Sequence, residues 1–217
     1  MIDLTPFCEL PPTMMAFFWG WLAIWSTIYI YCCIKYDTKK FSSSLAVHDT
    51  HAVGMVILCA LSLGIANEDV FSEMIPILFT LSYFIVDILD CLVRQDFMFM
   101  LHAILSIGIC ITTVSHPIHL QLRSVSQGGL TEFSTYPLHQ WQRTKKRKDF
   151  LIFALLFTLC RIFWIPYFIY HIYIELDHTV DFQVIAGLGL FFLNFMWWFK
   201  IINIVLNYKE TKTEKSE

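Results

Sequence analysis

The chain has 217 residues, of which 57% are hydrophobic and 17% aromatic, while only 15% are charged, and its formal net charge is −3. An ordinary soluble domain carries charge on about 25% of its residues, so this composition argues against a soluble globular protein. Glycine-rich phosphate loops and Walker motifs are absent, and the seven cysteines include no Cys-x-x-Cys pair. We therefore expect an all-α, polytopic membrane protein whose cysteines are small buried hydrophobic residues.

Apolar runs long enough to span a bilayer, which takes about 20 residues, recur along the chain. Six of them cover residues 14–34, 45–66, 71–93, 97–115, 150–174 and 182–206. A seventh segment, 118–141, has the right length but is too polar to face lipid. If it crosses, all basic clusters lie on one side of the membrane: Lys35, Lys39 and Lys40, then Arg94, the run Arg143–Lys148, and the lysines of the tail. By the positive-inside rule, the sequence predicts about seven transmembrane helices, with the amino terminus lumenal or extracellular and the carboxyl terminus cytoplasmic.

The domain organisation is predicted to be simple. Residues 1–43 form an amino-terminal segment with the first transmembrane helix, residues 44–207 form a helical bundle, and residues 208–217 form a charged cytoplasmic tail. No cleavable signal peptide is expected, because Met1–Leu10 has no basic region and the first apolar run is long enough to span.

Polar side chains inside the apolar runs are the candidates for a functional site. A carboxylate or imidazole at the centre of a bilayer helix costs about 2.5–3.5 kcal/mol or more, so it is usually paired, turned into the bundle, or functional. At about 1.5 Å per residue, Asp87 lies roughly 10 Å and His102 roughly 9 Å from the cytoplasmic rim, and His51 shares their layer on a third helix. We predict a site here; the alternative is a hydrogen-bond network that only fixes helix packing.

Two neighbouring patterns have simpler interpretations. Asp90 and Arg94 stand at i, i+4, which predicts an ion pair at the membrane rim. His48 and His51 share a helical face, but a metal ion would need a third ligand, so no metal site is predicted.

The polar segment 118–141 must lie inside the bundle or against a hydrated cavity, because its polar groups need partners away from water. If the helix is continuous, with a rise of about 1.5 Å per residue, Glu132 lies about 16 Å above Arg143 and Arg161 reaches about 18 Å on the next span. Glu132 and Arg161 are therefore predicted partners, and Ser134 lies on the same segment as Glu132.

Two further features border this region. Pro137 and Pro166 are each expected to kink a helix. The basic run Arg143–Lys148 is interpreted as a topology determinant and a contact for anionic lipid rather than as a nucleic-acid site. The same charges could attract the phosphates of an acyl-CoA.

Four motifs, in order and at suitable spacings, carry a resemblance to a known family. They are Tyr83-Phe84-x-x-Asp87, Arg94-x-Asp96-Phe97-x-x-Met100-Leu101-His102, Glu132-x-Ser134-Thr135-x-Pro137 and Arg161-x-x-x-x-Pro166. Together they resemble the TLC domain, which is shared by TRAM, the Lag-type ceramide synthases, the CLN proteins and smaller TLC-domain-containing proteins. The resemblance covers about Ser44 to Asn207, is closest to the smaller members, and implies a TLC-type helical bundle.

In ceramide synthases, two adjacent histidines serve acyl transfer from acyl-CoA to a sphingoid amine. The first histidine falls on His102 and the second on Ala103. Alanine can neither bond nor relay a proton, so ceramide synthesis does not carry over, whereas lipid binding in the bundle is still implied.

Three functions follow from these residues. The favoured one is a multi-pass protein of membrane-lipid homeostasis that binds or senses a lipid or acyl chain in a polar-lined cavity, with membrane lipids as partners and no cofactor. The second is an acyl-CoA-dependent lipid acyltransferase, and the third is a non-catalytic structural or trafficking adaptor. The endoplasmic reticulum and the plasma membrane both fit the span lengths.

Within the acyltransferase hypothesis each residue has a predicted role. His102 is the general base or nucleophile, and a carboxylate, Asp87 or Glu132, orients it. The predicted substrate-binding residues are His51, Ser134 and Arg161.

Overall fold

The computed structural model describes residues 5–35 and 45–207, and within them all regular structure is helical. The helices are α1 (Thr5–Cys8), α2 (Pro12–Lys35), α3 (Leu45–Ile65), α4 (Met74–Arg94), α5 (Phe97–Ser115), α6 (Pro117–Gln121), α7 (Ser124–Gly129), the 3₁₀ helix η2 (Leu130–Ser134), α8 (Thr135–Thr144), α9 (Arg147–Phe157), the π-helix η3 (Thr158–Phe163), α10 (Trp164–Glu175) and α11 (Phe182–Asn207). Six segments are long and apolar enough to cross a membrane, namely α2, α3, α4, α5, α9 to α10 as one unit, and α11. The predicted all-α membrane bundle is confirmed.

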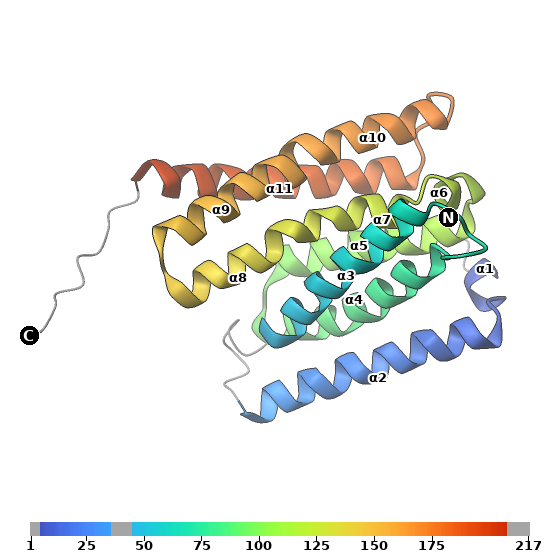
Figure 1. Cartoon of the computed structure of the whole chain (residues 1–217), viewed down its shortest axis with the longest axis horizontal. Helices are drawn as coiled ribbons and strands as arrows, with labels where there is room; N and C mark the ends of the chain where they lie inside the picture. The colour runs from blue at the N-terminus through green and yellow to red at the C-terminus, as the bar shows by residue number, and fades with distance from the viewer. Residues whose placement is uncertain (1–4, 36–44, 208–217) are drawn as a thin grey trace, which may run out of the picture.

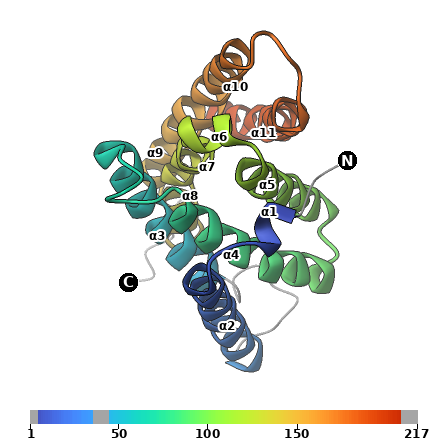
Figure 2. The same cartoon turned by 90° about the vertical axis from the view of Figure 1, so that its right-hand side faces the viewer.

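Helix α4 is the central helix of the bundle. Of its apolar stretch, 72% is buried, compared with 17% in α2. Seen end-on, α2 lies outside the ring of the other long helices and packs against α4 (Figure 2). Trp25 anchors it there, because the indole is fully buried against Phe79 and Tyr83 of α4. The first transmembrane helix is thus part of the bundle's packing.

The polar segment does traverse the bundle, although not as one helix. α6, α7, η2 and α8 follow one another from one end of the molecule to the other (Figure 1). Arg123, with a φ of 49°, separates α6 from α7, and η2 follows α7 directly. Pro137 lies in the first turn of α8, where a backbone N–H has no partner within the helix, so its absence costs no hydrogen bond. The proline therefore stands at the start of a new helix and does not kink a continuous one. The depth of Glu132 predicted from a continuous helix was therefore based on a wrong assumption.

The next crossing, α9 to α10, contains the π-helix η3. Pro166 has no N–H to donate to the carbonyl of Ile162, and its ring would clash with that carbonyl in a regular helix. The π-helix η3 has wider turns and contains Ile162, and it ends at Phe163, three residues before the proline. Short π segments of this kind are frequent at functional sites, and this one carries Arg161.

The two ends of the bundle differ in charge. The end we call basic carries Arg94, the run Arg143–Lys148 and the last turn of α11, whereas the acidic end carries Glu68, Asp69, Glu175, Asp177 and Asp181. α2 begins at the acidic end and α11 finishes at the basic end (Figure 1). The chain must therefore run the length of the bundle an odd number of times. The lysines at 39–40 and the whole of the predicted tail, 208–217, lie outside the described residues.

Candidate functional site

Two chambers lie between the helices and meet in the middle of the bundle. The wide chamber has a volume of about 490 Å³ and lies toward the basic end. The narrow chamber has a volume of about 110 Å³ and extends toward the acidic end. Four residues line both chambers, and we call them the shared layer: Phe84, His102, Glu132 and Arg161.

The wide chamber has one aromatic wall and one polar wall. Phe150, Phe153 and Phe157 of α9 and Trp197 of α11 form the aromatic side, and the polar side is formed by His48, Asp87, Arg94 and His139. Gln142 and the exposed Lys200 also line it. This chamber therefore suits a polar or amphipathic group close to the basic run.

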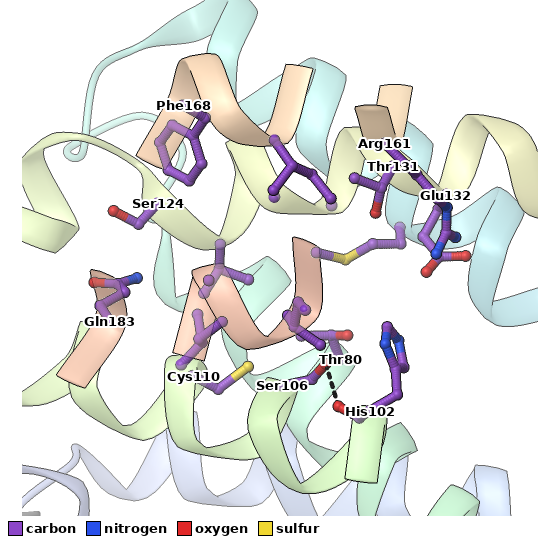
Figure 3. Close-up of a pocket in the computed structure, with 18 of the residues that line it drawn as sticks. Thr80, His102, Ser106, Cys110, Ser124, Thr131, Glu132, Arg161, Phe168 and Gln183 are labelled. Carbon is purple, nitrogen blue, oxygen red and sulfur yellow. Dashed lines mark hydrogen bonds between the residues drawn. The ribbon is translucent and has the colours of Figure 1, made fainter. Parts of the chain in front are cut away.

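The narrow chamber is mostly apolar between two polar ends. Ile109, Ile165, Phe168, Ile169 and Leu190 are among its lining residues. Figure 3 shows Glu132 and Arg161 together at one end, above His102, and Ser124 and Gln183 at the opposite end. Such a slot can hold an apolar chain whose polar group rests at the shared layer.

Arg161 is held in the chamber wall by neutral acceptors. Its Nε donates to Ser134 Oγ at 2.9 Å, Nη1 to Asn194 Oδ1 at 3.1 Å and Nη2 to Thr135 Oγ1 at 3.1 Å. Within the described parts of the chain, Arg161 has no ion pair with Glu132 inside 4 Å, so the two predicted partners share a layer without forming a salt bridge. A fixed cation and a fixed carboxylate thus face the space between the chambers.

His102 stands at the junction of the chambers, with Phe84 and Trp197 at ring-centroid distances of 6.0 Å. Its Nδ1 is buried and has no hydrogen-bond partner among the residues that the structure describes. Neither Asp87 nor Glu132 therefore orients this nitrogen as the acyltransferase hypothesis requires. Ala103 is fully buried in the hydrophobic core that includes Tyr83 and Phe84, and it does not line either chamber.

The two histidines of α3 have different surroundings. His51 Nε2 lies 2.9 Å from Thr80 Oγ1, and its ring stacks on Tyr83 at 3.6 Å between centroids. His48 Nδ1 lies 2.6 Å from the Tyr83 hydroxyl and 3.8 Å from Asp87 Oδ1. His51 thus lines the narrow chamber and His48 the wide one.

One group of metal-type donors is present in the described chain, formed by His48, Asp87 and Asp90, whose donor atoms lie within 4.8 Å of one another. Asp90, however, is in the predicted ion pair with Arg94, at 2.6 Å from Nη2, and His48 Nδ1 is engaged by Tyr83. As arranged, the guanidinium of Arg94 and the hydroxyl of Tyr83 already contact two of these three side chains, which disfavours a metal ion.

The structure brings all six predicted site residues to the walls of the chambers: His51, Asp87, His102, Glu132, Ser134 and Arg161. Their catalytic and substrate-binding roles stay predictions. Sequence reasoning missed Asn194, Ser124 and Gln183, each of which lines the narrow chamber. Asn194 could have been predicted as a site residue, because it is an isolated amide in the middle of an apolar run.

A second polar group is closed to solvent and to both chambers. Glu73, 0% exposed, accepts hydrogen bonds from Ser62 Oγ and Ser126 Oγ, each at 2.6 Å, and from Ser126 N at 2.8 Å. Arg123 donates to Ser62 Oγ at 2.7 Å and pairs with Glu68 at 2.9 Å. We call Glu73, Ser62, Ser126 and Arg123 the closed cluster, and half-exposed Glu68 lies at its border. The closed cluster ties α3, α4 and α7 together at the acidic end.

With this geometry in place, the comparisons with known proteins are decisive at the level of the family. A family model of the TLC domain matches residues 8–203. The chain belongs to the TLC domain family. No curated protein sequence matches it, and no solved structure does either. The TLC match begins before α2, whereas the sequence motifs that resemble the family begin at about Ser44, so α2 falls inside the family's region as well as inside the bundle.

Proposed function

We propose that this TLC-domain protein binds or senses a membrane lipid or acyl chain in its two chambers and thereby acts in membrane-lipid homeostasis. The observation that carries the proposal is the narrow, apolar chamber that ends on the charged shared layer of His102, Glu132 and Arg161. Ligand sites of this kind are largely apolar with a few fixed polar groups. The two chambers support this function over a purely structural adaptor, for which we would expect a closed interior.

The orientation of the protein is part of this proposal. The basic end faces the cytoplasm by the positive-inside rule, so the wide chamber lies on the cytoplasmic side and the amino terminus is lumenal or extracellular. The endoplasmic reticulum and the plasma membrane are the candidate membranes.

The test is to purify the full chain in mild detergent and identify the co-purifying lipids by mass spectrometry. A variant that fills the chamber, Gly128→Leu, is compared with the wild type. Gly128 lines the narrow chamber, and a Cβ added there meets no atom within 4 Å, so the leucine enters the open space. We expect one lipid class to be enriched in the wild type and strongly depleted in this variant.

The matched control is Gly20→Leu. Gly20 is an exposed residue of α2, and a Cβ added there also meets no atom within 4 Å. The control should retain the lipid of the wild type. Bulk membrane lipid in all three proteins, without enrichment, would contradict the proposal.

Acyl transfer is the second candidate, favoured by one observation: the Nδ1 of His102 is buried at the junction of the chambers without a partner in the described chain. In this reaction an imidazole nitrogen attacks the thioester carbonyl, the C–S bond breaks, and CoA leaves with the imidazole proton, giving an acyl-imidazole. Intact-protein mass would then show an acyl adduct that disappears in His102→Ala. A non-covalent lipid that the same variant retains would instead support lipid binding alone.

A further inference from the structure

The far end of the narrow chamber is polar, although it lies deep among apolar helices. Gln183 of α11 and Ser124 of α7 line it and are 3% and 1% exposed. Gln183 Oε1 and Ser124 Oγ have no hydrogen-bond partner within the described ranges. The great majority of buried polar atoms in native proteins are bonded. Two unpartnered atoms in the wall of one chamber therefore indicate a ligand with a polar group at this end.

The orientation of the Gln183 amide is determined by its neighbour Thr113. The Thr113 hydroxyl donates its only proton to the carbonyl oxygen of Ile109, at 2.8 Å. It can then only accept from Gln183, whose Nε2 lies 3.1 Å from Thr113 Oγ1. The amide oxygen is thus the atom left for the ligand, and the ligand must donate a proton to it.

The length of the slot follows from the helices that form it. Eleven residues separate His102 from Thr113 on α5, and eleven separate Asn194 from Gln183 on α11. Since Asn194 binds Arg161 and Thr113 binds Gln183, each helix runs from the shared layer to the far end. At about 1.5 Å per residue the separation is roughly 16 Å, which an extended chain of roughly a dozen carbons spans with bonds of about 1.5 Å.

We propose that the ligand of this site is a bipolar amphiphile, with its head group at the shared layer and a hydroxyl on the far end of its chain. The terminal hydroxyl donates to Gln183 Oε1 and accepts from Ser124 Oγ. A methyl terminus satisfies neither atom, and a carboxylate brings no proton for Gln183. This inference rests on the proposed lipid-binding function and specifies the class of lipid.

Binding of three probes to the full chain in detergent tests the inference: dodecanoic acid, ω-hydroxydodecanoic acid and ω-methoxydodecanoic acid. One hydrogen bond to an otherwise unsatisfied buried atom changes affinity by about tenfold. We expect the hydroxy acid to bind about tenfold more tightly than the plain acid. The methoxy acid can accept from Ser124 but cannot donate to Gln183, so it should bind more weakly than the hydroxy acid.

Variants of the far end should remove the preference without removing the binding. Ser124→Ala deletes only the unpartnered hydroxyl, and Gln183→Leu deletes the acceptor. Each should lower the affinity ratio of hydroxy to plain acid while the plain acid binds as before. Gln127→Leu, on α7 but outside the chamber wall, is the control that keeps the ratio. If Gln183→Leu does not fold, the affinity ratio measured for Ser124→Ala tests the inference by itself.

Two outcomes would overturn the inference and are distinct from each other. Equal affinities of the wild type for the plain and hydroxy acids would mean that water satisfies the far end, and the proposed lipid-binding function would stand. If none of the three acids binds, the inference and the proposed function both fail.

Discussion

Two carboxylates, Glu73 and Glu132, lie within the apolar bundle in opposite circumstances. Glu73 accepts three hydrogen bonds from Ser62 and Ser126 and is fully buried in the closed cluster. Glu132 lines both chambers, and among the described residues it has no ion pair within 4 Å. Charge in a membrane bundle can thus serve either to fix helices together or to face a ligand, and burial alone does not distinguish the two.

The partners of each carboxylate make the distinction. The donors of the closed cluster come from α3 and α7, so its hydrogen bonds replace water and hold three helices in register. At the shared layer, Arg161 is held by Ser134, Thr135 and Asn194, which leaves the carboxylate of Glu132 facing the chambers. The comparison predicts that substitutions at the first site change stability and that those at the second change binding.

The largest effect is expected for Glu73→Ala. Removing this carboxylate leaves the Ser62 hydroxyl and two donors of Ser126 without their acceptor. Each unsatisfied buried donor costs about 1–3 kcal/mol, so we expect a total loss of about 3 kcal/mol or more. The measurement is denaturation of the purified protein in detergent. Glu68→Ala, which removes a half-exposed carboxylate paired with Arg123, is the control and should cost about 1 kcal/mol or less. Similar losses in the two variants would contradict the role of the closed cluster.

Arg161→Met should have the next largest effect and should change both properties. It leaves Ser134, Thr135 and Asn194 without their donor, at about 1–3 kcal/mol for an unsatisfied buried group. It also removes the cation of the shared layer, so the bound lipid should be lost. Arg161→Lys should not restore binding, because an ammonium group cannot reproduce the planar fork that reaches three acceptors. Full stability together with wild-type lipid content in Arg161→Met would show that the fork is dispensable.

Glu132→Gln sharpens the comparison between the two carboxylates, because we expect it to change the stability of the fold only slightly. The carboxylate faces the chambers, so its neutralisation should change the free energy of unfolding by about 0.5 kcal/mol or less. The lipid head groups that co-purify should change, since one fixed negative charge has been removed from the shared layer. If Glu132→Gln unfolds as readily as Glu73→Ala, then both carboxylates are structural and the distinction is wrong.

The sequence predicted the layer of the site where its helices are continuous. His51, Asp87 and His102 lie on α3, α4 and α5, which are uninterrupted, and all three line the chambers: His51 the narrow one, Asp87 the wide one and His102 both. Their depth in the membrane stays a prediction. Counting residues at the helical rise failed for Glu132, because Arg123 and η2 interrupt its segment.

Partners that are distant in the chain could not be predicted in the same way. Glu73 follows Glu68 and Asp69 closely in the sequence, and nothing local indicates that it would be bonded by Ser126, 53 positions away. The pairing predicted between Glu132 and Arg161 was reasonable by charge and depth. The two side chains, both among the described residues, form no ion pair within 4 Å, because the guanidinium of Arg161 instead donates to Asn194, Ser134 and Thr135.

The last prediction concerns the basic run and separates its role from that of the chambers. Lys146 and Lys148 are exposed, and the same run begins just after Gln142, which lines the wide chamber. A basic residue near an anionic group contributes about 1 kcal/mol, or about fivefold in affinity. The double variant Lys146→Gln, Lys148→Gln should therefore weaken binding of an acyl-CoA at low salt and lose its effect at high salt, since exposed charges are screened. Affinity for the uncharged methyl ester of the same chain should not change. A loss of equal size for both probes would mean that the run supports the fold of the chamber mouth and does not attract phosphate.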